Sequence, residues 1–321
     1  MIIIYSKNTD PYFNIATEEY LLKNSLKDIF LIYQNKPSII VGKHQNVAKE
    51  VNLQYAFENK VPVIRRLTGG GTVYHDLGNI NFAFILNGEK GKLIDFKKYT
   101  QPIVDFLINK GINALLGERN NIFIEDYKIS GNAEHVFKNR VLHHGTLLFN
   151  TNIKNLNNSL NKQYSNYLDK SVNSVRSSVT NIKNYLPDNI EIDEFISMLI
   201  LSIKNKHNCE TNNLSQTEIE TIQNLINTKY STWEWNYGYS PEYSLEKNLN
   251  KNNKNLKISI QVKKGIIKYF NVSGNLVEQD ILNKINHLCT GIKHDYSEIF
   301  YIFNIINIES KLKKLLLNHI F

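Results

Sequence analysis

Cysteine and long apolar runs are both scarce in this chain of 321 residues. Its two cysteines, Cys209 and Cys289, stand far apart in unlike contexts, so they make neither a disulfide framework nor a zinc site. This use of cysteine is typical of a reducing compartment. No segment approaches the roughly 18–20 apolar residues that a membrane span needs, and no basic region with a cleavage signal opens the chain. We therefore expect a soluble, cytoplasmic protein with no membrane partner.

Arginine is absent from residues 246–321, although this stretch holds 12 lysines and 6 acidic residues. Scattered lysines of this kind indicate a solvated face. The whole chain carries 38 Lys and Arg against 30 Asp and Glu, a net charge of +8, with a pI near 9.1. Such an excess suits nucleic acid or an acidic protein. Because Asn, Lys and Ile are abundant throughout, a nucleic-acid-binding module rests on the pI alone, and we expect no nucleic-acid partner.

Helical and strand patterns are interspersed along the chain. Asp10-Pro11 before a periodic apolar run predicts a helix start, Asn52 predicts the cap of a short helix ending at Asn59, and 215–218 is a capping-box pattern. Strands are predicted at 29–33, 38–42, 61–65, 82–86, 112–116, 121–125, 127–130 and 141–150, and further helices at 96–110, 191–206 and 215–228. The mixture predicts an α+β fold, with mixed β-sheets and surrounding helices.

A change of composition suggests a second domain. Residues 245–257 are polar and of low complexity, which is typical of a linker. Beyond them, apolar runs at 256–262 and 266–272 around Lys-Lys-Gly predict a hairpin, and two helices follow. We therefore predict a catalytic domain at 1–245 and a small α+β accessory domain at 246–321.

The most informative stretch runs from Arg65 to Asn79 and reads Arg-Arg-Leu-Thr-Gly-Gly-Gly-Thr-Val-Tyr-His-Asp-Leu-Gly-Asn. Three consecutive glycines cost backbone entropy and bring no side chains, so they indicate that something approaches the backbone closely. Arginine forks and bare amides together suit an anion. A tight turn with two surface arginines is the alternative. The stretch is neither a Walker loop nor a dinucleotide fingerprint, since both patterns are absent.

A second informative stretch surrounds Lys128, in Lys-Ile-Ser-Gly-Asn-Ala. Taken alone, this lysine fits an exposed edge strand. A fixed ammonium would also suit the joining of a carboxylate to an ATP phosphate, because it lowers the cost of bringing two anions together. Farther along, His143 and His144 are adjacent on a predicted strand and point to opposite faces, so they cannot share one metal. Residues 174–181 form either a lid over a nucleotide or a Ser-rich surface turn.

These segments together resemble the lipoate–protein ligase family. The likeness covers Asp10 to Asn14, the two signatures above, His-His-Gly-Thr at 143–146, the lid and the tryptophan segment at 233–243, and it is loose only in the last domain. The resemblance implies a catalytic module similar to biotin ligases and class II synthetases. It also implies two half-reactions: lipoate and ATP give lipoyl-AMP and pyrophosphate, and then a lysine amine attacks the mixed anhydride. The implied acceptors are apo lipoyl domains of 2-oxoacid dehydrogenase acyltransferase subunits and the glycine-cleavage H protein.

By the same resemblance, Lys128 is the catalytic residue, and Arg66 with Gly71 to Tyr74 would contact ATP. The substrate-binding and ATP-binding residues that it implies are Arg66, Thr68, Gly69, Gly70, Gly71, Thr72, Val73, Tyr74, His75, Asn79, Asn120, Asn121, Lys128, Ser130, Ala133, His144 and Arg176. His75 and Asp76 have the spacing of a loop-stabilising pair.

One position departs from the family pattern. The family has Arg-Asn-Asp where this chain has Arg119-Asn120-Asn121, and the family's acid helps to hold Mg²⁺ on the ATP phosphates. A neutral amide oxygen ligates Mg²⁺ more weakly than a carboxylate. We expect Asn121 to be the metal contact, with phosphates, water, Glu125 or Asp126 as alternatives.

The nearest alternative function is an octanoyl or lipoyl transferase of the same fold. Its cysteine-dependent forms need a reactive thiolate in the site, and both cysteines here are far from the signatures. The missing Gly-Arg-Gly-Arg loop disfavours a biotin ligase. The sequence therefore favours the ATP-dependent lipoate ligase.

Overall fold

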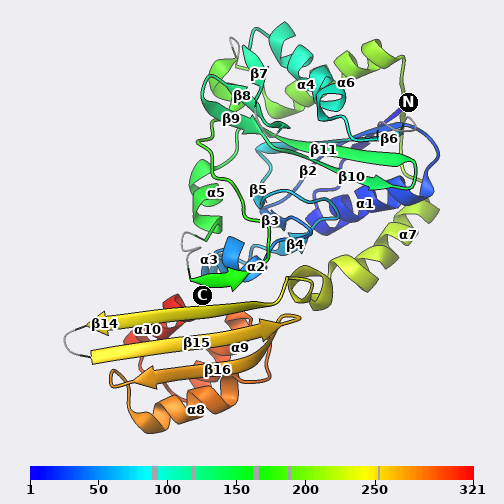
Figure 1. The fold of residues 1–321 in the computed structure, drawn as a ribbon. Helices are drawn as coiled ribbons and strands as arrows, with labels where there is room; N and C mark the ends of the chain where they lie inside the picture. Colours follow the sequence, from blue (N-terminus) through cyan, green and yellow to red (C-terminus); the bar gives the residue numbers. More distant parts are fainter. Residues whose placement is uncertain (89–92, 118–119, 162–165, 187–188, 252–253) are drawn as a thin grey trace. The chain divides into compact units, whose positions relative to one another are not determined.

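The computed structural model describes residues 1–321 except 89–92, 118–119, 162–165, 187–188 and 252–253. The chain packs as two compact units, each described by itself. The first contains Met1–Lys43, Ile64–Asn157 and Ser174–Thr232, and the second contains His44–Val63, Asn158–Asn173 and Trp233–Phe321. Mixed sheets with surrounding helices confirm the α+β prediction (Figure 1). The functional boundary between residues 245 and 246 stays a prediction.

The first unit is built on a six-stranded sheet of order β10-β11-β6-β2-β1-β13. Strand β1 pairs in parallel with β2 and β13, whereas β2, β6, β11 and β10 pair antiparallel, so the sheet is mixed. The strands are β1 (Ile2–Ser6), β2 (Ile29–Gln34), β6 (Asn79–Asn87), β10 (Asn132–Phe137), β11 (Arg140–Leu148) and β13 (Glu210–Asn212).

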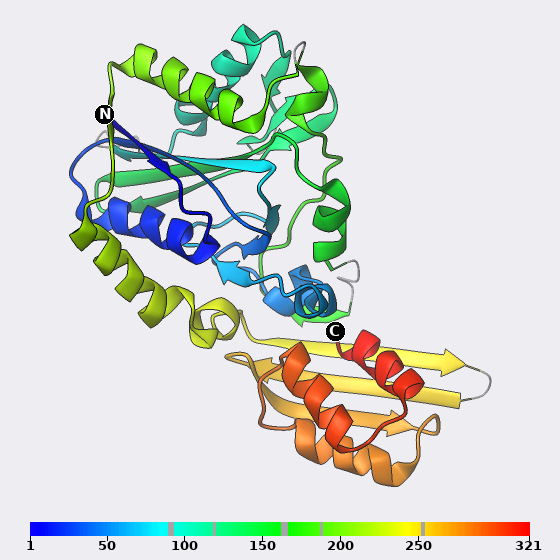
Figure 2. The same cartoon turned by 180° about the vertical axis from the view of Figure 1, so that it is seen from behind.

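Both faces of this sheet are buried, because successive apolar side chains of the central strands alternate between them. Phe30 and Phe84 pack with α4 (Phe96–Asn109) and α6 (Ile192–His207), whereas Leu31 and Ile85 pack with α1 (Pro11–Asn24). Figures 1 and 2 show α4 and α6 on one face and α1 with α7 (Gln216–Leu225) on the other.

Two three-stranded sheets carry the informative motifs. One has the order β4-β3-β5, with β3 at Ser38–Val41, β4 at Val63–Arg65 and β5 at Val73–His75. The other has the order β7-β8-β9, with β7 at Ala114–Leu116, β8 at Ile122–Ile124 and β9 at Tyr127–Ser130. The glycine-rich loop therefore joins β4 to β5, and Lys128 lies on β9. The remaining elements of this region are α5 (Ile153–Ser159), a 3-10 turn (Ile182–Tyr185) and a π-helical turn (Ile226–Tyr230).

The predicted helix starts are confirmed in their chemistry. The Asp10 side chain accepts the Tyr12 amide at the start of α1, with Pro11 as the first helical residue. Asn52 caps α3 (Leu53–Glu58) by accepting the Tyr55 amide, and Ser215 forms the predicted capping box with Glu218. Strand β10 was not predicted, because its residues are all half-buried and show no clean apolar alternation. Among the described helices, none combines the length and apolar character that crossing a bilayer requires.

The second unit contains a four-stranded antiparallel sheet of order β12-β14-β15-β16. Its elements are α2 (Val47–Glu50), α3, β12 (Tyr167–Asp169), a π-helical turn (Glu234–Gly238), β14 (Tyr243–Lys251), β15 (Lys254–Lys263), β16 (Ile266–Gly274), α8 (Gln279–Cys289), α9 (Tyr296–Ile305) and α10 (Ser310–Ile320). The predicted hairpin is β15 and β16, and three described helices follow it rather than two.

The prediction of a linker at 245–257 is wrong. The segment forms most of β14 and the start of β15, which pair along their whole described length. Its polar composition hides a strand alternation, in which Leu245 and Lys247 are buried while Glu246 and Asn248 are exposed. Because Lys247 occupies a buried position, the sequence of this segment resembles that of a solvent-exposed linker.

Candidate active site

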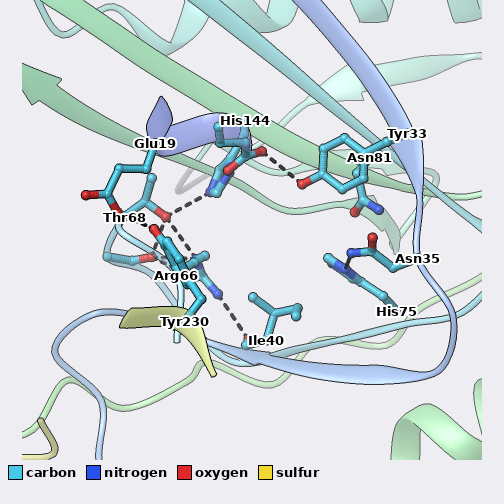
Figure 3. A network of polar contacts seen from close by, with 12 residues as sticks. Glu19, Tyr33, Asn35, Ile40, Arg66, Thr68, His75, Asn81, His144 and Tyr230 are labelled. Carbon is cyan, nitrogen blue, oxygen red and sulfur yellow. Dashed lines mark hydrogen bonds and ion pairs between the residues drawn. The ribbon is translucent and has the colours of Figure 1, made fainter. Parts of the chain in front are cut away.

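The Arg66 side chain hydrogen-bonds the backbone of the glycine loop. This side chain is 5% exposed, and it donates from Nη2 to the carbonyls of Gly69 (2.5 Å) and Gly71 (2.8 Å) and from Nη1 to that of Ile40 (3.1 Å) (Figure 3). Arg65 is fully buried and donates to the carbonyls of Gly42 and Lys43 instead. Arg66 thus occupies two carbonyls of the glycine loop, whereas Arg65 binds the segment that follows β3. The predicted contact of Arg66 with ATP stays a prediction.

The loop backbone leaves little room for side chains. Gly70 has φ +84°, and a Cβ there would lie 2.9 Å from Arg66 Nη2 and 3.6 Å from Ala133 Cβ. A Cβ on Gly69 would meet no atom within 4 Å. The glycines are therefore needed for conformation and close packing at Gly70, while open space lies beside Gly69.

A chain of hydrogen bonds runs from Arg66 to helix α1. Arg66 Nε donates to Thr68 Oγ1 (2.9 Å), which lies 2.8 Å from His144 Nε2. His144 Nδ1 lies 2.7 Å from Glu18 Oε2, and Glu18 Oε1 accepts the Tyr33 hydroxyl at 2.9 Å (Figure 3). Because the Glu18 carboxylate accepts, His144 Nδ1 carries the proton and its Nε2 accepts from Thr68. The chain fixes the tautomer of His144 beside the glycine loop.

His75 is held neutral next to this chain. Asn35 Nδ2, oriented by Asn14, lies 3.0 Å from His75 Nδ1, so the proton of the neutral ring is on Nε2. Burial, with the charge of Arg66 and that of His144, lowers the pKa of His75 to about 3. In the described part of the chain, His75 Nε2, Asn81 Nδ2 and Asn79 Oδ1 are buried without a hydrogen-bond partner. Such atoms are expensive to bury unpaired, so they are available to a polar group of a ligand.

Asp76 plays the loop-stabilising part that the sequence predicts. Its carboxylate accepts the amides of Gly78 (2.9 Å) and Asn152 (2.8 Å). Burial raises its pKa. These contacts fix the turn that leads into Asn79 and β6.

Lys128 projects over the backbone of Gly131. A Cβ built on Gly131 would lie 3.0 Å from Lys128 Nζ and 3.7 Å from Asn121 Oδ1, so the ammonium and the amide oxygen approach the same point. Burial and the charge of Arg66 lower the pKa of Lys128 to about 8. No hydrogen bond or ion pair of this ammonium to another described residue is present. A half-desolvated cation without a carboxylate partner is suited to bind an anion.

The segment 174–181 connects the glycine loop to Lys128. At one end Ser174 Oγ accepts the Thr72 amide at 2.9 Å, and at the other the Lys128 amide donates to the Ser178 carbonyl at 2.9 Å. Thr180 donates its amide to the Lys128 carbonyl at 3.3 Å, which makes a parallel bridge of Lys128 with Val179. Segment 174–181 therefore lies against both signatures at once, and its role as a lid over a nucleotide stays a prediction.

Some of the other predicted residues lie close to Lys128, and the rest lie on β5 or on segment 174–181. Ser130 is on β9, the strand of Lys128, and Asn132 links it to Asn120. Asn132 Nδ2 donates to the Asn120 carbonyl (2.6 Å) and to Ser130 Oγ (3.3 Å). Tyr74 is buried in β5, Val73 is half-buried beside it, and Arg176 is exposed on the lid. Arg119, part of the motif at 119–121, lies outside the described residues.

The two adjacent histidines face opposite sides of β11, as predicted. His143 is fully buried, lies 2.9 Å from Glu134 Oε1 and packs against Phe82, Phe96 and Tyr99. Burial lowers its pKa. It therefore belongs to the core on the α4 side, while His144 belongs to the site.

Sequence reasoning missed several residues of the site. Glu18, Tyr33 and Asn35 orient the two site histidines, and Ser174 binds the glycine loop. Glu18 lies four residues after the quoted Asp10 to Asn14 motif, one helical turn along α1, so its side chain is on the face of Asn14. That spacing is the one sequence signal that could have found it.

The residues around Lys128 offer Mg²⁺ few ligands. In the part of the chain that the structure describes, no group of three or more His, Cys, Asp or Glu side chains comes together as a metal site. Asn121 Oδ1 is a neutral oxygen beside a cation. This arrangement fits a metal that is carried mainly by phosphates and water rather than by a protein cage.

Comparison with known proteins gives a consistent result. Residues 10–204 match the family model of the lipoyl protein ligase A/B catalytic domain. Lipoate–protein ligase 1 of Staphylococcus aureus is 39% identical over 293 residues, which are 91% of this chain and 89% of that protein.

Two solved structures share the fold. Lipoate-bound LipL1 of P. falciparum has a TM-score of 0.62 at 27% identity, with 99% of both chains covered. An ATP-bound lipoate–protein ligase A has a TM-score of 0.63 at 25% identity, covering 74% of this chain and 98% of the other. Together with the glycine loop, the buried histidines and Lys128, these matches show that the chain belongs to the lipoyl protein ligase A/B family.

Proposed function

We propose that this protein is an ATP-dependent lipoate–protein ligase. It activates lipoate as lipoyl-AMP and transfers the lipoyl group to a specific lysine of an apo lipoyl domain. The observation that carries the proposal is that segment 174–181 hydrogen-bonds both the glycine loop, at Thr72, and the Lys128 backbone. The Lys128 ammonium is desolvated, feels the charge of Arg66 and approaches Asn121 Oδ1 over Gly131. Relatives named lipoate–protein ligase, and neighbours solved with lipoate and with ATP, support it.

In the first half-reaction, a carboxylate oxygen of lipoate attacks the α-phosphorus of ATP. The bond from that phosphorus to the bridging oxygen breaks, and pyrophosphate leaves. Both reactants are anions, so the cost of their approach falls when a fixed cation lies beside them. Lys128 would supply that cation, and the amides of Gly69 to Gly71, in the loop held by Arg66, would supply oriented donors. His144, oriented by Glu18, and the neutral ring of His75 would orient the acid.

In the second half-reaction, the neutral ε-amine of the acceptor lysine attacks the acyl carbon. An amide bond forms, AMP leaves with one of the original carboxylate oxygens, and the amine loses a proton. The proposed acceptors are acyltransferase subunits of 2-oxoacid dehydrogenases and the glycine-cleavage H protein. We also propose that residues 1–245 are catalytic and 246–321 are accessory.

Mg²⁺ is proposed as the companion of ATP, whose phosphate charge it would neutralise. Asn121 is the residue proposed to contact it through Oδ1. The sparse protein donors around Lys128 fit an ion held chiefly by phosphates and water.

The transferase alternative is disfavoured by both cysteines. Cys209 and Cys289 are buried, and burial raises the pKa of each thiol, that of Cys289 to about 12. A thioester enzyme needs a thiolate in its site. Cys209 packs in the core with α6, where its thiol lies 4.0 Å from the Ile203 carbonyl, and Cys289 belongs to the second unit.

The test is the intact mass of an apo lipoyl domain after incubation with the protein, lipoate, ATP and Mg²⁺. We expect the mass of one lipoyl group to be added, only when ATP is present. Modification that requires an acyl-carrier donor and proceeds without ATP would contradict the proposal and favour the transferase.

A further inference from the structure

A group of cationic side chains lies beside the glycine loop, on the α1 side of the sheet. We call it the β10 basic surface; it comprises Lys23, Lys43, His135, Lys138 and Lys229. None of these residues takes part in the site described above. The surface lies wholly in the first unit of the chain.

The strand register places this surface next to the site. In β10, Ala133 pairs with His144, and His135 pairs with Leu142, which packs in the core on the α1 side. A Cβ built on Gly70 would lie 3.6 Å from Ala133 Cβ, so this part of β10 adjoins the glycine loop. His135 is two residues after Ala133 on β10. Because side chains alternate along a strand, His135 lies on the same face of the sheet as Ala133 and His144. Lys43 is tied to the glycine loop through its backbone, because its amide donates to the Thr68 carbonyl at 2.8 Å. Its charge acts on His135.

The lysines converge on this face from three other elements. Lys23 of α1 and Lys138 of the β10–β11 turn both lie over the Phe137 ring, at 5.5 and 5.4 Å from its centre. Lys229 follows α7 and binds Glu19 Oε2 at 2.5 Å. Burial, with the charges of Lys43, Lys23 and Lys229, lowers the pKa of His135, and Glu19 opposes this.

The acidic groups on this face do not neutralise it. Glu19 is 2% exposed, and its two oxygens are occupied by Lys23, Lys229 and the Tyr230 hydroxyl. Glu218 of α7 lies near Tyr20, whose pKa burial and that carboxylate raise. Glu18 of α1 is also buried, and its oxygens are occupied by His144 and the Tyr33 hydroxyl. Four lysines thus face two buried, occupied carboxylates and one peripheral one. Scattered surface lysines do not have this arrangement: here Lys23 and Lys138 lie over one ring, Phe137, and Lys23 and Lys229 bind one acid, Glu19.

We propose that the β10 basic surface docks the acceptor protein, by binding an acidic patch that flanks its target lysine. The inference rests on the proposed function and names the surface that serves its second half-reaction. The acceptor amine must reach an acyl carbon held at the glycine loop, so the acceptor has to cover a surface adjoining that loop. A cluster of cations beside the loop attracts acids that flank the target lysine, which gives both orientation and a faster encounter.

The experiment separates the two half-reactions in the full-length protein. Lys23 and Lys138 are exposed and outside the site, so the variant is K23E/K138E. The matched control is K97E/K204E, with the same charge change on exposed positions of α4 and α6, the opposite side of the sheet. K23R/K138R preserves the charge. Thermal melting establishes that each variant is folded.

Preformed lipoyl-AMP is supplied, and transfer to an apo lipoyl domain is followed by mass. For K23E/K138E we expect KM for the acceptor to rise at least tenfold at low salt, with kcat within about twofold and a weaker dependence of the rate on salt. K97E/K204E and K23R/K138R are expected to keep the KM of the parent protein. Pyrophosphate release in the first half-reaction, and transfer to hydroxylamine, are expected to be unchanged in all three.

An unchanged acceptor KM in K23E/K138E overturns the inference, and so does an equal rise in K97E/K204E. A loss of pyrophosphate release in K23E/K138E also overturns it, by assigning the surface to the nucleotide. Failure of the parent protein itself to make lipoyl-AMP would instead contradict the proposed function, so the two failures are distinguishable.

Discussion

At the residue scale, the contacts of Arg65 and Arg66 differ from the anion contacts that their charge predicts. A pair of arginines beside glycines predicts an anion held by guanidinium groups, yet Arg65 and Arg66 bind main-chain carbonyls. Their positive charge still matters, because Arg66 lowers the pKa values of Lys128 and His75. The arginine thus shapes the loop and makes the neighbouring cation less stable until an anion arrives.

Lys128→Ala should abolish catalysis of adenylate formation without unfolding the chain. Loss of one preorganised charge at a developing anion costs about 3–4 kcal/mol in the transition state, a fall of roughly 10²–10³ in rate. Stability should hold, because Lys128 is partly desolvated and makes no side-chain hydrogen bond to a described residue. Pyrophosphate release and thermal melting measure the two effects. Lys97→Ala on α4 is the control, and an equal rate in both variants would refute the role of Lys128.

Thr68→Val tests the chain from Arg66 to Glu18. The change keeps the shape but removes the hydroxyl that accepts from Arg66 and donates to His144. Leaving buried polar atoms unpaired costs about 1–3 kcal/mol, so we expect a lower free energy of unfolding and a higher KM for lipoate. Denaturant unfolding and initial rates are the measurements. Thr221→Val, at an exposed position of α7, should change neither; a Thr68→Val protein that matches it would show that the chain is dispensable.

Sequence could indicate which residue types gather here but not how they pair. His144 and Lys128 follow from motifs, whereas Tyr33 and Asn35 lie on β2 in a segment that looks like ordinary core. Their roles depend on register between strands that are distant in sequence, and no local pattern fixes that register.

At the element scale, the glycine loop depends on the backbone of one residue. Gly70 and Gly111 have nearly the same φ, +84° and +81°, but only Gly70 would place a Cβ against another residue. Alanine at either position should cost about 1 kcal/mol in backbone strain.

Gly70→Ala should in addition displace Arg66 Nη2, which lies 2.9 Å from the new Cβ, and so disorder the loop. We expect adenylate formation to fall at least tenfold in Gly70→Ala and to stay unchanged in Gly111→Ala. Pyrophosphate release measures this, with melting to compare stability. Equal activity in the two variants would mean that the loop tolerates a side chain.

Strand β14 carries a buried cation that gives a pH test. Burial lowers the pKa of Lys247 to about 8, and its Nζ lies 3.5 Å from the Asn318 carbonyl of α10. In the unfolded chain the pKa is near 10.4. Below pH 8 the folded protein bears the full cost of the buried charge, and the cost declines as pH rises from 8 toward 10.4.

Lys247→Met should therefore raise the free energy of unfolding by about 2 kcal/mol at pH 7. The difference between the two proteins should shrink as pH rises above 8. Urea unfolding at pH 7 and pH 9.5 is the measurement, and Lys257→Met, at an exposed position of β15, is the control. A destabilised Lys247→Met protein at pH 7 would show that the contact with Asn318 outweighs the desolvation.

Elements with strong local signals could be predicted, and those that depend on partners could not. The capped helices α1 and α7 have the expected starts, because a cap is a local hydrogen bond. Strands β10 and β14 were missed, because half-buried polar residues and a buried lysine conceal their alternation. Their pairing partners, β11 and β15, stabilise them.

At the scale of the whole molecule, the proposed chemistry needs two motifs that are more than 50 residues apart in sequence. The segment 174–181 is hydrogen-bonded to both, at Thr72 and at Lys128. The order of motifs along the chain indicates the family, but only the three-dimensional structure shows that one segment spans them. The division of labour between 1–245 and 246–321 remains our proposal.

The most direct test of the account follows an oxygen atom. Lipoate labelled with ¹⁸O in its carboxyl group is incubated with the protein, ATP, Mg²⁺ and an apo lipoyl domain, and the nucleotide products are analysed by mass spectrometry. We predict that AMP gains one labelled oxygen and that pyrophosphate gains none, because the carboxylate attacks the α-phosphorus. Unlabelled AMP, or label found in phosphate released with ADP, would contradict a carboxylate and an α-phosphate meeting beside Lys128.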